Sequence, residues 1–260
     1  MLPTDPSTTI PRSIRRSGKI NRWLSGALIA LLLSNTLVSR ADDIRVGFYN
    51  APPLMIQQSN SGIYHELLQQ VGAITGDNFI IEYFSIARLQ RSFEEGKLDL
   101  EPGVNPQWRQ QSPVPGVYSD AFASLEQILL FRPGKALQVT GPRSLAGKQI
   151  GTIRGYIYPG FSQSFASGEI ERIDVTDEPQ LLRLLEKGRV DQVFIDRVVQ
   201  RHWAVQNPQF KDYQASQPLS DIAIMLRLHP SRSGKLASIN SALALLHQRG
   251  VTEQIFERYQ

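Results

Sequence analysis

The sequence contains 260 residues, with 28 lysines and arginines against 24 aspartates and glutamates, and no cysteine. Its hydrophobic content of 41% is typical of a globular chain, and its length is enough for two modest domains with separate cores. The lack of cysteine in the sequence excludes disulfides, thiolate metal sites, a thiol nucleophile and a lipid-modified cysteine.

Residues 1–41 are predicted to form a secretory signal peptide. Basic residues precede an apolar stretch over 23–38, and small residues stand at alternate positions in Ser39-Arg40-Ala41. A membrane anchor is the alternative, but the stretch is short for a span of about 20 residues. The pair Arg15-Arg16 lacks the apolar residues that usually follow it in twin-arginine export. We expect cleavage after Ala41 and localisation in the periplasm.

The positive charge of the chain lies mostly in this leader. Removal of residues 1–41 leaves 22 basic and 23 acidic residues, so the remainder carries a formal charge of −1. The excess of basic residues therefore gives no support for a nucleic-acid partner.

Strands and helices alternate after the leader. The alternating segment 43–49 predicts a strand, and apolar residues at helical spacing from Ile63 to Ile74 predict a helix that stops at Gly76. A predicted strand over 79–84 and a predicted helix over 86–95 follow. This β-α-β-α order predicts a mostly parallel sheet with crossover helices.

Two segments of the chain repeat one pattern. Residues 93–99 (FEEGKLD) and 185–191 (LEKGRVD) both follow an amphipathic helix, and each glycine can end that helix in the left-handed conformation. Residues 149–156 begin the later half much as residues 44–49 begin the earlier half. A common helix-to-strand turn would explain one match, but two matches in the same order favour two similar α/β lobes.

Open α/β sheets bind ligands at the carboxyl ends of their strands. Segment 101–109 follows a predicted strand over 98–100 and ends at Arg109, and Asp196 follows a predicted strand over 190–195. If the lobes face each other, a small zwitterion could place its carboxylate in the fork of Arg109 and its ammonium at Asp196. The alternatives are a surface arginine and an aspartate that caps the next helix.

In this combination the sequence resembles the bacterial extracellular solute-binding proteins of family 3, periplasmic receptors that deliver amino acids to ABC importers. The resemblance extends from Ile44 to Tyr259. It is carried by the opening strand with Ala51-Pro52-Pro53, the two repeated segments, the loop from Pro106 to Arg109, segments 118–122 and 144–151, and a closing helix near 243–259.

The resemblance implies an α/β, two-lobed periplasmic-binding-protein fold, type II-like, in which two crossover strands join the lobes. Lobe 1 would comprise residues 42–123 plus 220–260, and lobe 2 would comprise residues 124–219. Hinge closure on a ligand would then produce the form that a membrane transporter reads.

The resemblance also implies roles for individual residues. Arg109 matches the arginine that grips the ligand α-carboxylate, and Asp196 matches the acid that receives the α-amine. Tyr49 falls near an aromatic residue of the ligand side-chain pocket. Gly155-Tyr156 falls on a turn whose backbone N–H groups assist the carboxylate.

The sequence departs from the family pattern just before the arginine. Family members usually carry serine or threonine there, whereas this chain runs from Glu101 to Asn105 without either. Glu101 would suit a second ammonium on the ligand, or would pair with Arg88 or Arg109. A cationic or polyamine-like ligand therefore gains weight. We add Glu101, Asn105, Arg88 and Tyr118 to the candidate ligand-binding residues, the last because an aromatic ring suits an apolar group or a cation.

Signatures of other chemistry are missing from the sequence. Its four histidines are isolated, and it has no P-loop, no G-x-S-x-G and no G-x-G-x-x-G. We expect a monomeric binding protein without metal or cofactor, served by an ABC permease. Two alternatives stay open: a periplasmic dehydratase of the same fold that acts on prephenate-like cyclic carboxylates with Glu101 or Asp196 as the acid, and a ligand-binding module for a membrane sensor.

Overall fold

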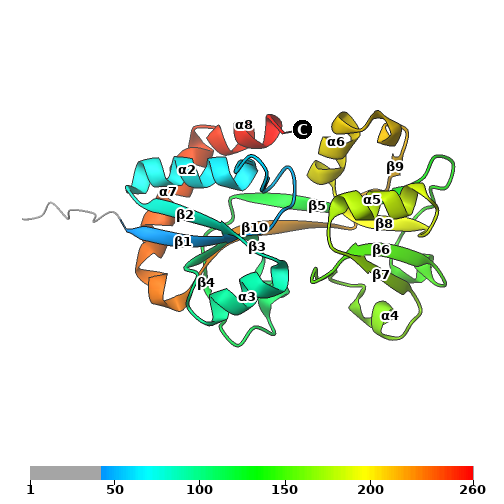
Figure 1. Ribbon diagram of the computed structural model, residues 1–260, viewed down its shortest axis with the longest axis horizontal. Coiled ribbons are helices and arrows are strands. Elements are labelled where there is room, and N and C mark those ends of the chain that lie inside the picture. The colour runs from blue at the N-terminus through cyan, green and yellow to red at the C-terminus, as the bar shows by residue number, and fades with distance from the viewer. Residues whose placement is uncertain (1–41, 260) are drawn as a thin grey trace, which may run out of the picture. The chain divides into compact units, whose positions relative to one another are not determined.

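The computed structural model describes residues 42–259, so the predicted signal peptide lies outside the described residues. Within them, strands form one hydrogen-bonded series in the order β2-β1-β3-β10-β5-β8-β6-β7, with β4 beside β10 and β9 beside β5 (Figure 1). The strands are β1 (Asp43–Phe48), β2 (Asn78–Tyr83), β3 (Leu100–Val104), β4 (Val117–Tyr118), β5 (Ala123–Phe131), β6 (Gln149–Ile153), β7 (Glu171–Val175), β8 (Gln192–Asp196), β9 (Gln214–Ala215) and β10 (Ser220–Leu228).

Helices connect these strands and cover them. The α-helices are α2 (Ile63–Thr75), α3 (Ile86–Glu94), α4 (Ser162–Ala166), α5 (Glu178–Glu186), α6 (Arg197–Gln206), α7 (Leu236–Gln248) and α8 (Val251–Glu257). Short 3-10 helices are η1 (Pro106–Arg109), η2 (Pro142–Leu145), η3 (Pro208–Phe210) and η4 (Pro230–Lys235). Among residues 42–259 no helix has the length and apolar content that a membrane span requires.

Two long strands join two lobes. Residues 220–224 of β10 pair antiparallel with residues 123–127 of β5. Beyond this shared segment β10 continues against β3, whereas β5 continues against β8. The first lobe is therefore built on β2-β1-β3 and the end of β10, and the second on β7-β6-β8 and the end of β5 (Figure 1). The predicted pair of crossover strands is confirmed.

The core of the first lobe follows from the alternation in β1. Ile44, Val46 and Phe48 are each at most 1% exposed and point to one face of the sheet. Leu67 and Val71 of α2 are buried in the same apolar cluster. The predicted helix is observed with its end at Gly76, as the spacing indicated.

The repeated segments play the same role in both lobes. The carboxylate of Asp99 accepts a hydrogen bond from the Arg45 N–H of β1 at 2.9 Å, and the Asp99 N–H donates to the Arg45 carbonyl at 2.8 Å. Asp191 makes the equivalent two bonds with Gln149 of β6, both at 2.8 Å. Each aspartate thus ties the end of a helix to the start of the lobe's first strand, so the repeat in sequence is a repeat in structure.

Glycines allow each helix to lie close to its strand. Gly96 and Gly188 follow α3 and α5 with φ of 68° and 64°, the left-handed conformation expected of them. Gly47 of β1 and Gly151 of β6 face the same helices, and a Cβ at Gly47 would lie 2.6 Å from a methyl carbon of Leu98. The strand therefore needs a residue without a side chain at this point.

Most predicted boundaries lie within two residues of the observed ones, and two elements differ by more. The expected strand over 98–100 is observed as β3 at Leu100–Val104. It extends further because residues of β10, far along the chain, pair with it, and a bulge in this pairing accommodates Pro102 and Gly103. The expected closing helix near 243–259 is observed as α7 and α8, separated at Gly250, where φ is 67°.

We predict that Gly151→Ala destabilises the fold. The new Cβ would lie 2.8 Å from Val193 Cγ1 and 2.9 Å from Leu181 Cδ1, so strand and helix must separate, at a cost of about 1–3 kcal/mol. Denaturant unfolding measures this cost. Gly234→Ala is the control, because a Cβ there meets no atom within 4 Å. Equal midpoints for the two variants would contradict the close packing.

Candidate functional site

A cavity of about 50 Å³ lies where the two lobes face each other. This volume holds a few water molecules. The first lobe contributes residues from the end of β1, from α2 and α3, and from β3 and η1, while the second contributes the loop after β6 and the end of β8. The lining residues are Tyr49, Leu54, Tyr64, Ile86, Glu101, Pro102, Gly103, Val104, Trp108, Arg109, Leu125, Gln127, Gly155, Tyr156, Ile157 and Asp196.

Arg109 reaches this cavity from η1, which Asn105 anchors. The Asn105 Oδ1 accepts from the Gln107 N–H at 2.9 Å and caps the 3-10 helix. Its Nδ2 donates to the Ala223 carbonyl of β10 at 2.8 Å. Asn105 therefore positions Arg109 and does not line the cavity itself.

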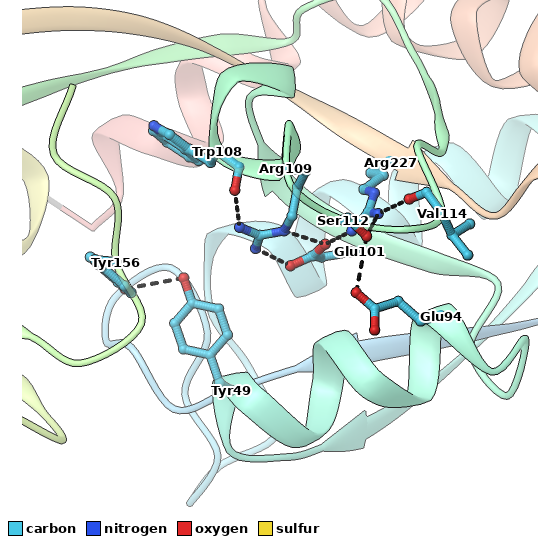
Figure 2. Close-up of polar contacts among 9 residues, drawn as sticks. All are labelled: Tyr49, Glu94, Glu101, Trp108, Arg109, Ser112, Val114, Tyr156 and Arg227. Atoms are coloured by element: carbon cyan, nitrogen blue, oxygen red, sulfur yellow. Dashed lines mark hydrogen bonds and ion pairs between the residues drawn. The ribbon is translucent and has the colours of Figure 1, made fainter. Parts of the chain in front are cut away.

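The guanidinium of Arg109 is paired within the chain. Its Nε donates to Glu101 Oε2 at 3.2 Å, its Nη2 donates to Glu101 Oε1, and its Nη1 donates to the Trp108 carbonyl at 3.1 Å (Figure 2). Burial lowers the pKa of Arg109, but the charge and hydrogen bonds of Glu101 raise it by more. Since an arginine has five N–H donors, two of them remain for a ligand.

A second arginine holds Glu101 from the other side. Arg227 of β10 is completely buried, and its Nη1 donates to Glu101 Oε2 at 3.1 Å. Its Nη2 donates to Ser112 Oγ at 2.9 Å and to the Val114 carbonyl at 2.5 Å (Figure 2). The guanidinium carbon lies 4.0 Å from the centre of the Phe93 ring. One buried carboxylate is thus clamped between two arginines, and the group carries one net positive charge.

Asp196 brings negative charge from the second lobe. Burial raises the pKa of its carboxyl group to about 7. The carboxylate makes no capping hydrogen bond to α6, which begins at the next residue, so the alternative of a helix cap is not observed. Glu178, the first residue of α5, is also buried, and burial with the nearby Asp196 and Asp177 raises its pKa to about 8. The second-lobe face is therefore acidic, whereas the first-lobe face is basic.

Two tyrosines meet across the cleft. The Tyr156 hydroxyl donates to the Tyr49 hydroxyl at 3.1 Å, and their rings lie edge to face with centres 6.1 Å apart (Figure 2). Burial raises the pKa of both hydroxyls, so both stay neutral. This contact links the first lobe to the second beside the cavity.

Two further donors on the cavity wall have no partner among residues 42–259. The Tyr64 hydroxyl and the Trp108 indole N–H are both buried and make no hydrogen bond. The Tyr64 ring lies over Gly103, where a Cβ would be 2.3 Å from a ring carbon, so β3 admits only glycine at this point. Unpaired buried donors are unfavourable, and a ligand with acceptor oxygens would satisfy them.

Six of the nine residues predicted from sequence meet at this cavity: Arg109, Asp196, Glu101, Tyr49, Gly155 and Tyr156. Three do not line it. Asn105 anchors η1, Tyr118 of β4 pairs through its backbone with Arg227 of β10, and Arg88 is exposed on α3. Of the two predicted arginine partners of Glu101, the structure has Arg109 and not Arg88.

Sequence reasoning missed three important residues. Arg227 is the one charged residue in the apolar segment 222–228 of β10, which was a usable signal for a buried ion pair. Glu178 stands at the start of a helix, where an acid is expected for other reasons. Tyr64 lies on the apolar face of α2 and is indistinguishable in sequence from a core residue. In the described residues no cluster of three or more histidine, aspartate or glutamate side chains could hold a metal ion.

Comparison with known proteins identifies the fold. No family model and no curated protein matches the sequence. The GluR0 ligand-binding core from Nostoc punctiforme, in complex with L-glutamate, has a TM-score of 0.70 at 17% identity, with 83% of this chain and 98% of that chain covered.

Two further structures have TM-scores close to this value. The P235GK mutant of ArgBP from T. maritima has a TM-score of 0.69 at 20% identity, covering 84% of this chain and 94% of that one. A substrate-binding protein of an ABC uptake transporter from Streptococcus pneumoniae, with bound histidine, has a TM-score of 0.68 at 19% identity and covers 84% and 92%. This chain therefore has the two-lobed periplasmic-binding-protein fold, as predicted.

We predict that Glu101→Gln destabilises the protein by about 3–5 kcal/mol, because it leaves the completely buried Arg227 without a counter-charge. Glu126→Gln is the matched control. Glu126 pairs with Arg197, but its side chain is 41% exposed, so its loss should cost less than about 1 kcal/mol. Chemical unfolding of both variants gives the comparison, and equal losses would show that burial does not set the strength of the Glu101 contacts.

We also predict a pH dependence from Asp196. An unfolded aspartate releases its proton near pH 4, whereas the folded protein retains this one up to about pH 7. Ionisation therefore opposes folding, and stability falls between these values by at most about 4 kcal/mol. In Asp196→Asn this part of the fall should disappear while the part due to the buried Glu178 stays, so the variant is more stable than the natural protein at pH 8. Melting curves across pH test this, with the exposed Asp221→Asn as control; unchanged curves for Asp196→Asn would refute it.

Proposed function

We propose that this protein is a periplasmic solute-binding protein that captures a small amino-acid-like ligand between its lobes and delivers it to an ABC importer. The observation that carries the proposal is the cavity between the lobes, with Arg109 on the first-lobe wall and Asp196 on the second. A ligand with a carboxylate and an amine would bridge these opposite charges.

The ligand carboxylate has suitable donors on the first lobe. Arg109 keeps two N–H groups beyond those that Glu101 and Trp108 occupy. Tyr64 and Trp108 line the same cavity, and the hydroxyl of the one and the indole N–H of the other are unpaired. These groups take the place of the serine or threonine that family 3 receptors usually carry. The positive charge left on the two-arginine clamp favours an anionic group at this wall.

The ligand amine is proposed to lie against Asp196. A bound ammonium would lower the pKa of this carboxyl group and stabilise its charged form. Glu178 extends the acidic wall toward a larger groove, of about 560 Å³, that Tyr49 and Tyr156 also line. A second amine on a cationic ligand would be recognised there, whereas Glu101 is already neutralised by its two arginines.

We propose that the two lobes close on the ligand before it is transported. We take lobe 1 as residues 42–123 plus 220–260 and lobe 2 as residues 124–219, so that β5 and β10 form the hinge. The similar structures described above include an ABC substrate-binding protein and a ligand-binding core, which supports a binding role. We propose a monomer that is secreted by its signal peptide and recognised in its closed form by a permease.

A dehydratase is the second candidate, because two carboxyl groups near the cavity hold protons close to neutral pH. Asp196 and Glu178 have pKa values raised to about 7 and about 8, in the range that suits a general acid. Such an acid would protonate the leaving hydroxyl of a cyclic carboxylate. Consumption of prephenate by the protein, lost in Asp196→Asn, would decide for the enzyme.

We predict that Arg109→Ala abolishes most ligand affinity, at a cost of about 2–5 kcal/mol, because the ligand carboxylate would be buried without its counter-charge. Calorimetric titration with amino acids, diamino acids and polyamines, after a thermal-shift screen for the tightest of them, measures the loss. Arg88→Ala is the matched control, since Arg88 is exposed and does not line the cavity. Equal affinity in the two variants would refute the assigned site.

A further inference from the structure

The residue that follows the predicted cleavage site lies in a charged cluster on the first lobe. The carbonyl of Asp42 accepts from the Asn78 N–H at 3.0 Å, which fixes the entry into β1 beside β2. The backbone N–H of Asp42 donates to Oδ1 of Asp77 at 3.3 Å. The nitrogen that cleavage after Ala41 would expose is therefore already held against a carboxylate.

Asp77 is unusually placed for a carboxylate in a loop between α2 and β2. Its side chain is 1% exposed, and its Oδ1 accepts from Lys235 Nζ at 2.7 Å. Its own N–H donates to Thr75 Oγ1 at 3.2 Å, which orients the turn. The other oxygen, Oδ2, is buried and has no hydrogen-bond partner within residues 42–259. A buried carboxylate oxygen without a donor is unfavourable.

Cleavage would change the charge of this cluster. Lys235 Nζ also lies 2.9 Å from the Asp42 carboxylate, so the side chains of Asp42, Asp77 and Lys235 together carry one net negative charge. In the uncut chain the Asp42 nitrogen is a neutral amide with one proton. Hydrolysis of the bond between Ala41 and Asp42 consumes one water, leaves a carboxylate on Ala41 and gives Asp42 an ammonium with three N–H donors.

We propose that Asp77 is a built-in receptor for the mature N-terminus: removal of residues 1–41 places the α-ammonium of Asp42 on Asp77, and processing thereby stabilises the folded protein. The ammonium adds a positive charge and two N–H donors near the unpaired Oδ2 of Asp77. This inference rests on the predicted cleavage after Ala41 and is independent of any ligand.

The receptor has a defined pH dependence. A free α-amino group has a pKa of about 7.7–8.0. The carboxylates of Asp77 and Asp42 would raise the pKa of the Asp42 α-amine, and the Lys235 ammonium would oppose them in part. Asp43, the next acid along the chain, accepts from the side-chain amide of Asn78 at 2.9 Å. Because the folded-state pKa is raised, the stabilisation is complete below about pH 7.5 and is lost as the pH rises through the raised value.

The first test is the N-terminus itself. The full chain is expressed with its leader in a bacterium, and the mass of the exported product is measured. We expect a product that begins at Asp42. A product that begins at any other residue would overturn the proposal, because its ammonium would lie away from Asp77.

The second test compares two processed chains, one that begins at Asp42 and one that retains a single alanine before it. At pH 7 the first should melt roughly 2–4 °C higher, which is the shift that one such interaction produces in a chain of this size. The difference should vanish at pH 10 and in the Asp77→Asn background. Equal melting temperatures at pH 7 would overturn the proposal.

A third measurement does not depend on the folding of a variant. The pKa of the Asp42 α-amine in the processed natural protein can be read by NMR titration. A value above the ordinary 8 supports the contact with Asp77, whereas a value at or below 8 contradicts it.

Discussion

The first-lobe wall of the cleft depends on the ion pairs that the buried carboxylate of Glu101 makes with two arginines. This carboxylate neutralises Arg227, which is completely buried in a crossover strand, and it holds the Arg109 fork from the opposite side. Two buried arginines would be unfavourable without it. The same carboxylate therefore allows β3 and β10 to pair, and it presents Arg109 to the cavity with part of its hydrogen-bonding capacity unused.

The crossover strands β5 and β10 connect the lobe that holds this cluster to the second lobe. β5 and β10 share one short ladder and then diverge, so the chain passes between the lobes along these two strands. Opposite the basic wall the second lobe places Asp196 and Glu178, and burial raises the pKa of both carboxyl groups. The cleft thus has a charge asymmetry that a zwitterionic ligand would complete, and the contact between Tyr49 and Tyr156 already brings the walls together.

Much of the architecture was readable in the sequence because its causes are local. Helix α2 ends at the predicted glycine. The two repeated segments, each with its aspartate, correctly predicted two lobes of similar construction. Arg109 and Asp196 were identified because strand ends converge in such sheets. The extent of β3 was not readable, since its partner in β10 is more than a hundred residues away and nothing near Pro102 and Gly103 indicates a strand.

The sequence by itself determined the order of the elements, the repeat and the residue types at the ends of the strands, because propensity, periodicity and glycine conformation act over a few residues. Only the tertiary structure decided which charges meet. Glu101 could have faced a ligand, Arg88 or Arg109, and folding placed it between Arg109 and Arg227. Ion pairing and burial depend on distances between segments remote in the chain, and those distances exist only once the sheet has formed.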